Sequence, residues 1–186
     1  MVEDRFPRVV SLACHDLRTP LATIYGFART LGRGGELDER NARFVEMMEA
    51  AAEQMTELLD ALGAAARIAA DRFEPALREA DTLELARAAD QRIEASGVGA
   101  TIETDVEALE RALRALAVAA IRFGPADRVA WHVDGRLLEL APVRAAAAPV
   151  VTGEEIRDLG ALVARAVIEA LGGSFELAGE TLRVTL

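Results

Sequence analysis

The 186-residue sequence contains no lysine, because all 21 of its basic residues are arginine. This absence excludes mechanisms that need a Schiff-base lysine or a phosphate-loop lysine. The single cysteine, Cys14, excludes an intramolecular disulfide and is typical of a reducing compartment. With only two histidines beside that cysteine, the sequence also predicts no structural zinc site.

Aromatic residues make up only 4% of the chain, whereas 52% of it is hydrophobic, so the core must consist of Ala, Leu and Val. No apolar run is long enough to span a membrane, and we therefore expect a cytoplasmic protein without a membrane partner. The net charge of -10 argues against nucleic acid as a partner, because no basic surface could balance a phosphate backbone.

Chemically active side chains are concentrated in residues 14–21, CHDLRTPL, where His15, Asp16, Arg18 and Thr19 fall within two helical turns. Apolar residues around them alternate spacings of four and three, the a/d pattern of a helix that packs against other helices. These residues are Phe6, Val10, Ala13, Leu17, Pro20, Ile24, Phe27 and Leu31. His15 then occupies position f, the point farthest from the apolar seam.

The first 72 residues are predicted to form a helical hairpin. One helix extends from about Asp4 to Leu31, glycines at 32–35 end it, and Asp38 caps a second amphipathic helix. The seam of the second helix contains Phe44, Met48, Ala51, Met55, Leu58, Leu62 and Ala65. A two-fold dimer that forms a four-helix bundle would cover this wide apolar face. The alternative is a monomer whose hairpin packs against its own second half.

Residues 73–186 contain both helix and strand candidates, and this pattern predicts a two-layer α+β sandwich. We expect helices at 81–95, from 105 to about 121, and at 153–171. Residues 96–99 are expected to end the first of these helices. Strands are predicted at 100–104, 128–133, 136–140, 174–177 and 181–186, with a hairpin turn at Asp134-Gly135.

The sequence HDLRTPL at 15–21 resembles the H-box of two-component sensor histidine kinases, including the proline at the fifth position after the histidine. The second half resembles the ATP-binding domain that follows the hairpin in those kinases. The resemblance therefore implies an α+β protein with a dimerising hairpin (1–72) followed by a degenerate kinase-type ATP-binding domain (73–186).

The second half departs from the kinase pattern at each nucleotide-binding element. Ala115 and Ala119 stand where the family has asparagines, and residues 138–145 lack the aspartate and glycines of the adenine-reading turn. Only Gly160 remains of the later glycine-rich segment, and the lid is expected to be deleted. Alanine offers no oxygen ligand to magnesium. We therefore expect this chain to bind neither ATP nor another cofactor, and no metal.

A phosphoaccepting histidine without an ATP site resembles the dimeric histidine phosphotransferases of phosphorelays. This resemblance implies that His15 carries a phosphoryl group between aspartates of response-regulator receiver domains, with magnesium supplied by the receiver. Asp16 would orient the imidazole ring and stabilise its protonated form. Arg18 would either steady the bundle or reach the phosphate oxygens, and Thr19 could position a water for dephosphorylation of a bound receiver.

The receiver is expected to dock on the hairpin near His15, and Arg8, Leu12 and Tyr25 are candidates for its contacts. Two other functions stay open at this point. The chain could be a non-catalytic pseudo-kinase scaffold, a receiver-binding regulator or a phosphatase. An ATP-dependent autokinase is the least favoured reading, because the nucleotide-binding residues are missing.

Overall fold

The computed structural model describes residues 6–34, 37–90 and 92–186. Its contacts divide the chain into two compact units, Met1–Asp71 and Arg72–Leu186. Each unit is described by itself below. Among the described residues, no helix has the length and hydrophobicity of a membrane span.

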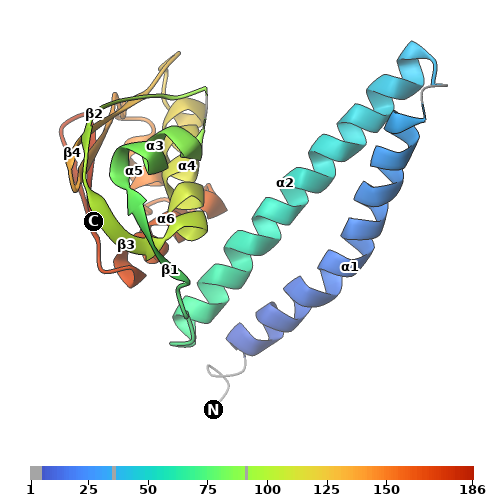
Figure 1. Cartoon of the computed structure of the whole chain (residues 1–186), viewed down its shortest axis with the longest axis horizontal. Coiled ribbons are helices and arrows are strands. Elements are labelled where there is room, and N and C mark those ends of the chain that lie inside the picture. Colours follow the sequence, from blue (N-terminus) through green and yellow to red (C-terminus); the bar gives the residue numbers. More distant parts are fainter. Residues whose placement is uncertain (1–5, 35–36, 91) are drawn as a thin grey trace. The chain divides into compact units, whose positions relative to one another are not determined.

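The first unit is a hairpin of two long antiparallel helices, α1 (Phe6–Arg33) and α2 (Glu39–Ala69) (Figure 1). The predicted start of the first helix at Asp4 lies outside the described residues. Asp38 caps α2 as predicted, since its carboxylate accepts a hydrogen bond from the backbone N–H of Asn41. Pro20 lies inside α1, and the helix continues through it.

The two helices contact each other through a stripe that differs from the predicted seam. The contact stripe consists of Cys14, Leu21 and Ala28 in α1 and of Val45, Ala52, Leu59, Gly63 and Ala66 in α2. Cys14, Leu21, Ala52 and Leu59 form its buried cluster. By contrast, Leu17 and Phe27 of the predicted seam are 52% and 67% exposed. The a/d seam is therefore an open surface of this hairpin, not the interface between its two helices.

The described residues of the second unit form two sheets and four helices. Its elements are β1 (Leu77–Asp81), α3 (Thr82–Ala89), β2 (Glu94–Gly99), β3 (Thr101–Asp105), α4 (Val106–Phe123), β4 (Ala130–Gly135), β5 (Leu137–Ala141), α5 (Ala148–Val151), α6 (Leu159–Ala170), β6 (Ser174–Ala178) and β7 (Thr181–Thr185). The main sheet has the order β2-β4-β5-β7-β6, and only β2 and β4 pair in parallel. The strands β1 and β3 form a separate antiparallel pair.

The helices α3, α4 and α6 gather on one face of the five-stranded sheet (Figure 1). The core between these layers is apolar and fully buried, with Trp131, Leu138 and Leu140 from the strands and Leu109, Leu113 and Leu116 from α4. The α+β class, a helical hairpin followed by a two-layer α/β unit, is confirmed.

Three local predictions for the second unit were wrong. Residues 94–99 form strand β2 instead of ending a helix, and α3 stops at Ala89. Of the helix expected at 153–171, only α6 forms, and the carboxylate of Asp158 caps it, while the short α5 lies before the expected start. The turn between β4 and β5 is shifted by one residue, because Asp134 pairs with Leu137.

Candidate functional site

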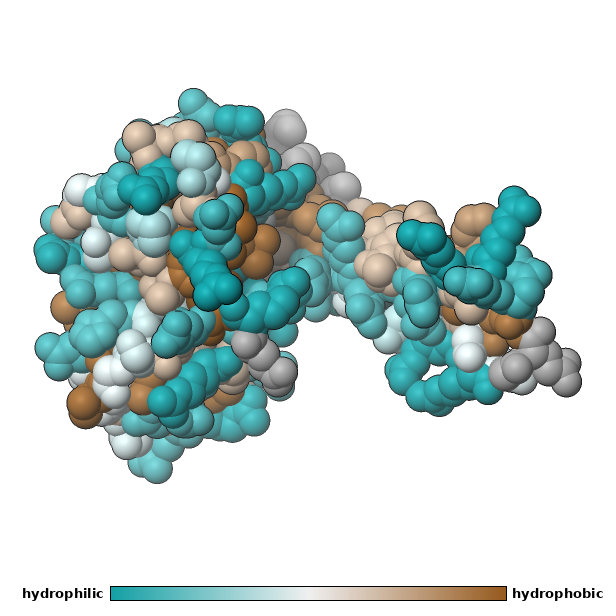
Figure 2. Space-filling view, turned by 90° about the horizontal axis from the view of Figure 1, so that it is seen from above, coloured by the Kyte–Doolittle hydropathy of each residue, from teal (hydrophilic) through white to brown (hydrophobic). Residues whose placement is uncertain are grey.

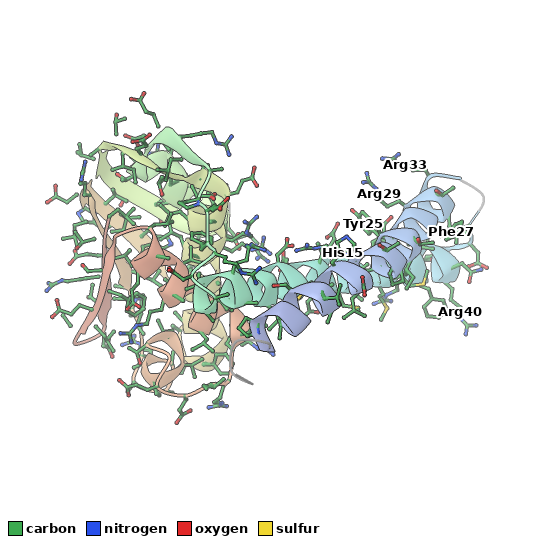
Figure 3. All side chains as sticks on the ribbon, turned by 90° about the horizontal axis from the view of Figure 1, so that it is seen from below. His15, Tyr25, Phe27, Arg29, Arg33 and Arg40 are labelled. Carbon is green, nitrogen blue, oxygen red and sulfur yellow. The ribbon has the colours of Figure 1, made fainter. Side chains whose placement is uncertain are left out.

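His15 lies in the first half of α1 (Figure 3). Its side chain is 78% exposed, which agrees with its predicted f position. Nδ1 of His15 lies 3.2 Å from Oδ1 of Asp16, whose side chain is also exposed. When Nδ1 carries the proton, it donates to Asp16, and Nε2 keeps the lone pair that can attack an electrophile. The pair thus presents a nucleophilic nitrogen to solvent.

Arg18 connects the two helices of the hairpin. Its Nη2 donates to Oδ1 of Asp60 in α2 at 2.5 Å, and both side chains are partly exposed. A charge-assisted hydrogen bond between the helices fits a role in steadying the hairpin near His15. The partial exposure also leaves the guanidinium accessible from solvent, so the geometry accommodates both predicted roles of Arg18.

Thr19 is exposed on α1, and its backbone carbonyl accepts a hydrogen bond from the Thr23 hydroxyl. Because Thr19 is exposed, its side chain lies on a solvent-facing part of the helix, one turn beyond His15. This position is compatible with the predicted contact to a water at a docked receiver, and none of the described hydrogen bonds of the chain uses the Thr19 side chain.

The candidates for receiver docking have different environments. Leu12 is 61% exposed on α1, whereas the half-buried Tyr25 donates its hydroxyl to Glu53 at 2.9 Å. The hydrogen bond to Glu53 raises the pKa of Tyr25 above its ordinary value, and Arg29 lies over its ring. The side chain of Arg8 lies outside the described part of the structure. Tyr25 therefore joins α1 to α2 through its hydroxyl group.

Three residues of α2 near the site were not singled out from the sequence: Asp60, Gly63 and Arg67. A Cβ placed on Gly63 would lie 3.4 Å from Nη1 of Arg67 and 3.8 Å from Nη2 of Arg18. The missing side chain at position 63 therefore leaves room for two guanidinium groups. A glycine inside a long amphipathic helix was the available signal, because it lowers helix stability unless a close approach requires it.

In the second unit, apolar side chains pack around Ala115 and Ala119, the positions where the resemblance predicted lost asparagines. Ala119 of α4 is fully buried, and a Cβ on Gly160 of α6 would lie 3.2 Å from Cβ of Ala115. The helix α5 packs against both α4 and α6. The buried residues in and before α5 are Val143, Ala147, Val150 and Val151, each at most 1% exposed. The Asp158 carboxylate, also 3.2 Å from the Gly160 Cβ position, caps α6 and lies 3.6 Å from Arg122.

The described residues contain no group of three or more His, Cys, Asp or Glu side chains that could hold a metal ion. The paired atoms at His15 and Asp16 involve one nitrogen and one carboxylate only. Within the described residues, the site is therefore a nucleophile with one adjacent carboxylate, without the donor set of a metal centre.

Residues 8–71 match the family model described as the His Kinase A (phospho-acceptor) domain. The hairpin is therefore similar to the phosphoacceptor domain of histidine kinases. Two solved structures resemble the whole chain. The crystal structure of full-length ShkA in complex with AMPPNP has a TM-score of 0.60 at 21% identity over 96% of this chain and 44% of the ShkA chain. Histidine kinase AdeS of Acinetobacter baumannii has a TM-score of 0.53 at 19% identity over 92% of this chain and 95% of the AdeS chain.

At this level of identity, the two structures show that the fold of both units is histidine-kinase-like. The chain spans less than half the length of the ShkA chain. No curated protein matches the sequence. The match to the phosphoacceptor domain covers His15, Arg18, Asp60 and Arg67, so all the hairpin residues described above belong to the histidine-kinase-like segment.

Proposed function

We propose that this histidine-kinase-like chain is a phosphorelay histidine phosphotransferase that carries a phosphoryl group on His15. The observation that carries the proposal is the exposed His15 ring, held at Nδ1 by Asp16 and open at Nε2. The donor and the acceptor are aspartates of response-regulator receiver domains. The receiver is expected to supply the magnesium, because the aspartate that carries the phosphoryl group is one of its own residues.

The transfer step balances without an added reactant. The lone pair of His15 Nε2 attacks phosphorus, the N–P bond forms, and the bond between phosphorus and the aspartyl oxygen breaks, which releases the receiver carboxylate. The proton stays on Nδ1, where Asp16 stabilises the positive charge of the ring. The second receiver reverses these bond changes with its own carboxylate. Catalysis therefore consists mainly of positioning and charge stabilisation.

A function without ATP binding is supported by the packing of the second unit. Magnesium needs oxygen ligands, and Ala115 and Ala119 provide none. The valines in and before α5 are buried between helices of that unit. Insertion of a nucleotide there would require this apolar packing to open, at a cost of about 1 to 3 kcal/mol for each large side chain exposed.

A homodimer is part of the proposal, because each hairpin leaves its a/d seam uncovered. Hydrophobic residues lie at the surface of the hairpin (Figure 2). Those of the seam and its border are Leu17, Ile24, Phe27 and Leu31 in α1 and Phe44, Met47, Met48, Met55, Leu58 and Leu62 in α2. Association of two hairpins along this surface would form a four-helix bundle and leave His15 on its outer side.

The decisive experiment follows acid-labile label on the protein. Wild type and His15→Ala are incubated with labelled ATP and, separately, with a panel of receiver domains phosphorylated by labelled acetyl phosphate. We expect label to pass from a receiver to wild type but not to His15→Ala, and no labelling from ATP. Absence of label on the wild type with every receiver would refute the proposed function.

The same experiment identifies the alternatives. A scaffold would bind receivers equally well with and without His15 and would never acquire label. An autokinase would become labelled from ATP at His15. A receiver phosphatase would release inorganic phosphate from the receiver, and Thr19→Ala would slow this release more than it slows transfer to His15.

A further inference from the structure

Arg18 of α1 and Arg67 of α2 both approach Gly63 of α2. Two hydrogen-bonded pairs, Arg18–Asp60 and Tyr25–Glu53, show which residues of the antiparallel helices lie opposite each other. From the first pair to the second, α1 advances by seven residues and α2 goes back by seven. His15 lies three residues before Arg18 in α1, and Gly63 lies three residues beyond Asp60 in α2. Because the helices are antiparallel, Gly63 therefore lies at the level of His15. It is over Gly63 that the guanidinium groups of Arg18 and Arg67 approach each other.

The placement of Arg18 relative to His15 follows from helix geometry. Residues three apart on a helix are neighbours, with Cβ atoms about 5 to 6 Å apart. Arg18 therefore borders the exposed imidazole on the side that faces α2, and the buried Gly63 allows its side chain to cross to that helix. Any side chain longer than alanine at position 63 would compete for this space.

The charge of the cluster around Gly63 favours an anion. Asp60 neutralises one of the two guanidinium groups, so the cluster of Arg18, Arg67 and Asp60 keeps one net positive charge. A guanidinium presents five N–H donors in a planar fork, of which Asp60 takes one on Arg18 in this structure. The remaining donors can bind oxygens of a phosphoryl group attached to His15 or arriving at it.

We propose that Arg18 and Arg67, brought together over Gly63, form an anion subsite that binds the phosphoryl oxygens during transfer, and that Asp60 is a positioning residue for Arg18. This inference rests on the proposed function and extends it to three residues, two of which lie outside the H-box. In the transfer step, the arginines stabilise the charge on the equatorial oxygens while phosphorus moves between the aspartyl oxygen and Nε2.

The test compares transfer rates from phosphorylated receivers at saturating receiver concentration for wild type, Arg18→Gln, Arg67→Gln, Arg18→Lys and Asp60→Asn. Removal of one charge-stabilising donor is expected to lower kcat at least about tenfold for each glutamine variant. Arg18→Lys keeps the charge but loses the fork, and should fall between wild type and Arg18→Gln. Arg40→Gln removes one positive charge near the start of α2 and serves as the matched control with an unchanged rate.

Asp60→Asn separates the chemical role of Arg18 from a structural one. If Arg18 only ties the helices together, Asp60→Asn and Arg18→Gln break the same ion pair and slow transfer equally, which would overturn the proposal. We expect Asp60→Asn to lower kcat less than Arg18→Gln does. Circular dichroism and unfolding curves establish that each variant is folded, and Arg67→Gln tests the subsite independently of the pair.

The outcomes also separate this inference from the proposed function. Failure of the wild type to accept label refutes both. Normal transfer by wild type, combined with unchanged kcat in Arg18→Gln and Arg67→Gln, refutes the anion subsite alone. A rise in KM with unchanged kcat would show that the arginines dock the receiver without acting on the phosphoryl group, and would also overturn the inference.

Discussion

The carboxylate of Asp16 determines which ring nitrogen of His15 can attack. Because Asp16 accepts from Nδ1, it favours the tautomer with a free Nε2 and stabilises the charged ring after phosphorylation. Asp16→Asn is therefore expected to slow transfer about 100-fold, the lower end of the range for acid–base assistance. Single-turnover transfer from a phosphorylated receiver, measured on both sides of the ordinary histidine pKa, is the appropriate assay.

The control for this prediction is Asp134→Asn, which removes an exposed carboxylate from the second unit. Its transfer rate should equal that of the wild type. Equal rates for Asp16→Asn and wild type at every pH would show that the short distance between Asp16 and His15 has no role in the reaction.

Asp90, at the end of α3, makes the stability of the second unit depend on acidity. Hydrogen bonding from Arg92 lowers the pKa of Asp90 from 3.8 to about 2, and its side chain is only 8% exposed. A carboxyl group with a lowered pKa stabilises the fold above its unfolded pKa, and this contribution is lost as pH falls through the folded value. The shift corresponds to at most about 2 kcal/mol.

We therefore expect the unfolding free energy of the second unit to fall between about pH 4 and pH 2, and Asp90→Asn to remove this part of the dependence. At neutral pH the variant should be less stable by at most about 2 kcal/mol. Urea unfolding at a series of pH values measures both effects. A parallel decline in wild type and variant below pH 4 would contradict the prediction.

At the scale of the helix, Gly63 lowers the stability of α2 and leaves space for the side chains of Arg18 and Arg67. A Cβ at this position would make only ordinary contacts, 3.4 Å from Arg67 and 3.8 Å from Arg18. Gly63→Ala is therefore expected to stabilise the hairpin by up to about 1 kcal/mol, because alanine loses less conformational entropy in a helix. Thermal unfolding of the full chain measures the change.

Gly63→Leu provides the comparison for this prediction. Leucine also favours the helix, but its side chain would need the volume that the two guanidinium groups occupy. The variant should gain less stability than Gly63→Ala. Equal stabilisation by both substitutions would mean that the arginines move away without cost, and that the glycine is not required for their approach.

Helix ends were predictable from the sequence where the signal was local. Asp38 and Asp105 cap α2 and α4 as expected, because a cap involves only its own residue and the next three. Strand β2 was missed, since its Ser-Gly-Val-Gly segment is typical of a turn. Gly97 has a positive φ, and the backbone of Val133 occupies the place of a Cβ there. Only the distant strand β4 reveals why this segment is extended.

In the candidate site too, contacts within one short motif were predictable from the sequence, and contacts between the two helices were not. His15, Asp16 and Arg18 lie in one short motif, so their proximity followed from helix periodicity. The partners in α2 could not be predicted, because the contact between Arg18 and Asp60 depends on how far the two helices are shifted along each other. That shift results from packing around the buried cluster of Cys14, Leu21, Ala52 and Leu59.

At the scale of the whole molecule, the open apolar seam requires a partner surface. The hairpin buries one stripe between its own helices and leaves a second stripe of large hydrophobic residues in water. A contiguous apolar surface of this kind marks an interaction site in a soluble protein. The seam repeats at heptad spacing along both helices, which is the pattern that a second copy of the same hairpin can match.

A charge in the middle of the seam should therefore break the dimer. Ile24 is 54% exposed in the single chain, and a two-fold bundle would bury it in both copies. Ile24→Glu would place two unpaired carboxylates in the apolar interface, so we expect the dimer dissociation constant to rise at least about 100-fold.

Ala22→Glu, at an exposed f position of the same helix, adds the same charge and should leave the dimer intact. Sedimentation or light scattering over a range of concentrations distinguishes the cases. A dimeric Ile24→Glu would place the interface elsewhere, and a monomeric wild type would mean that the chain covers the seam with its own second unit.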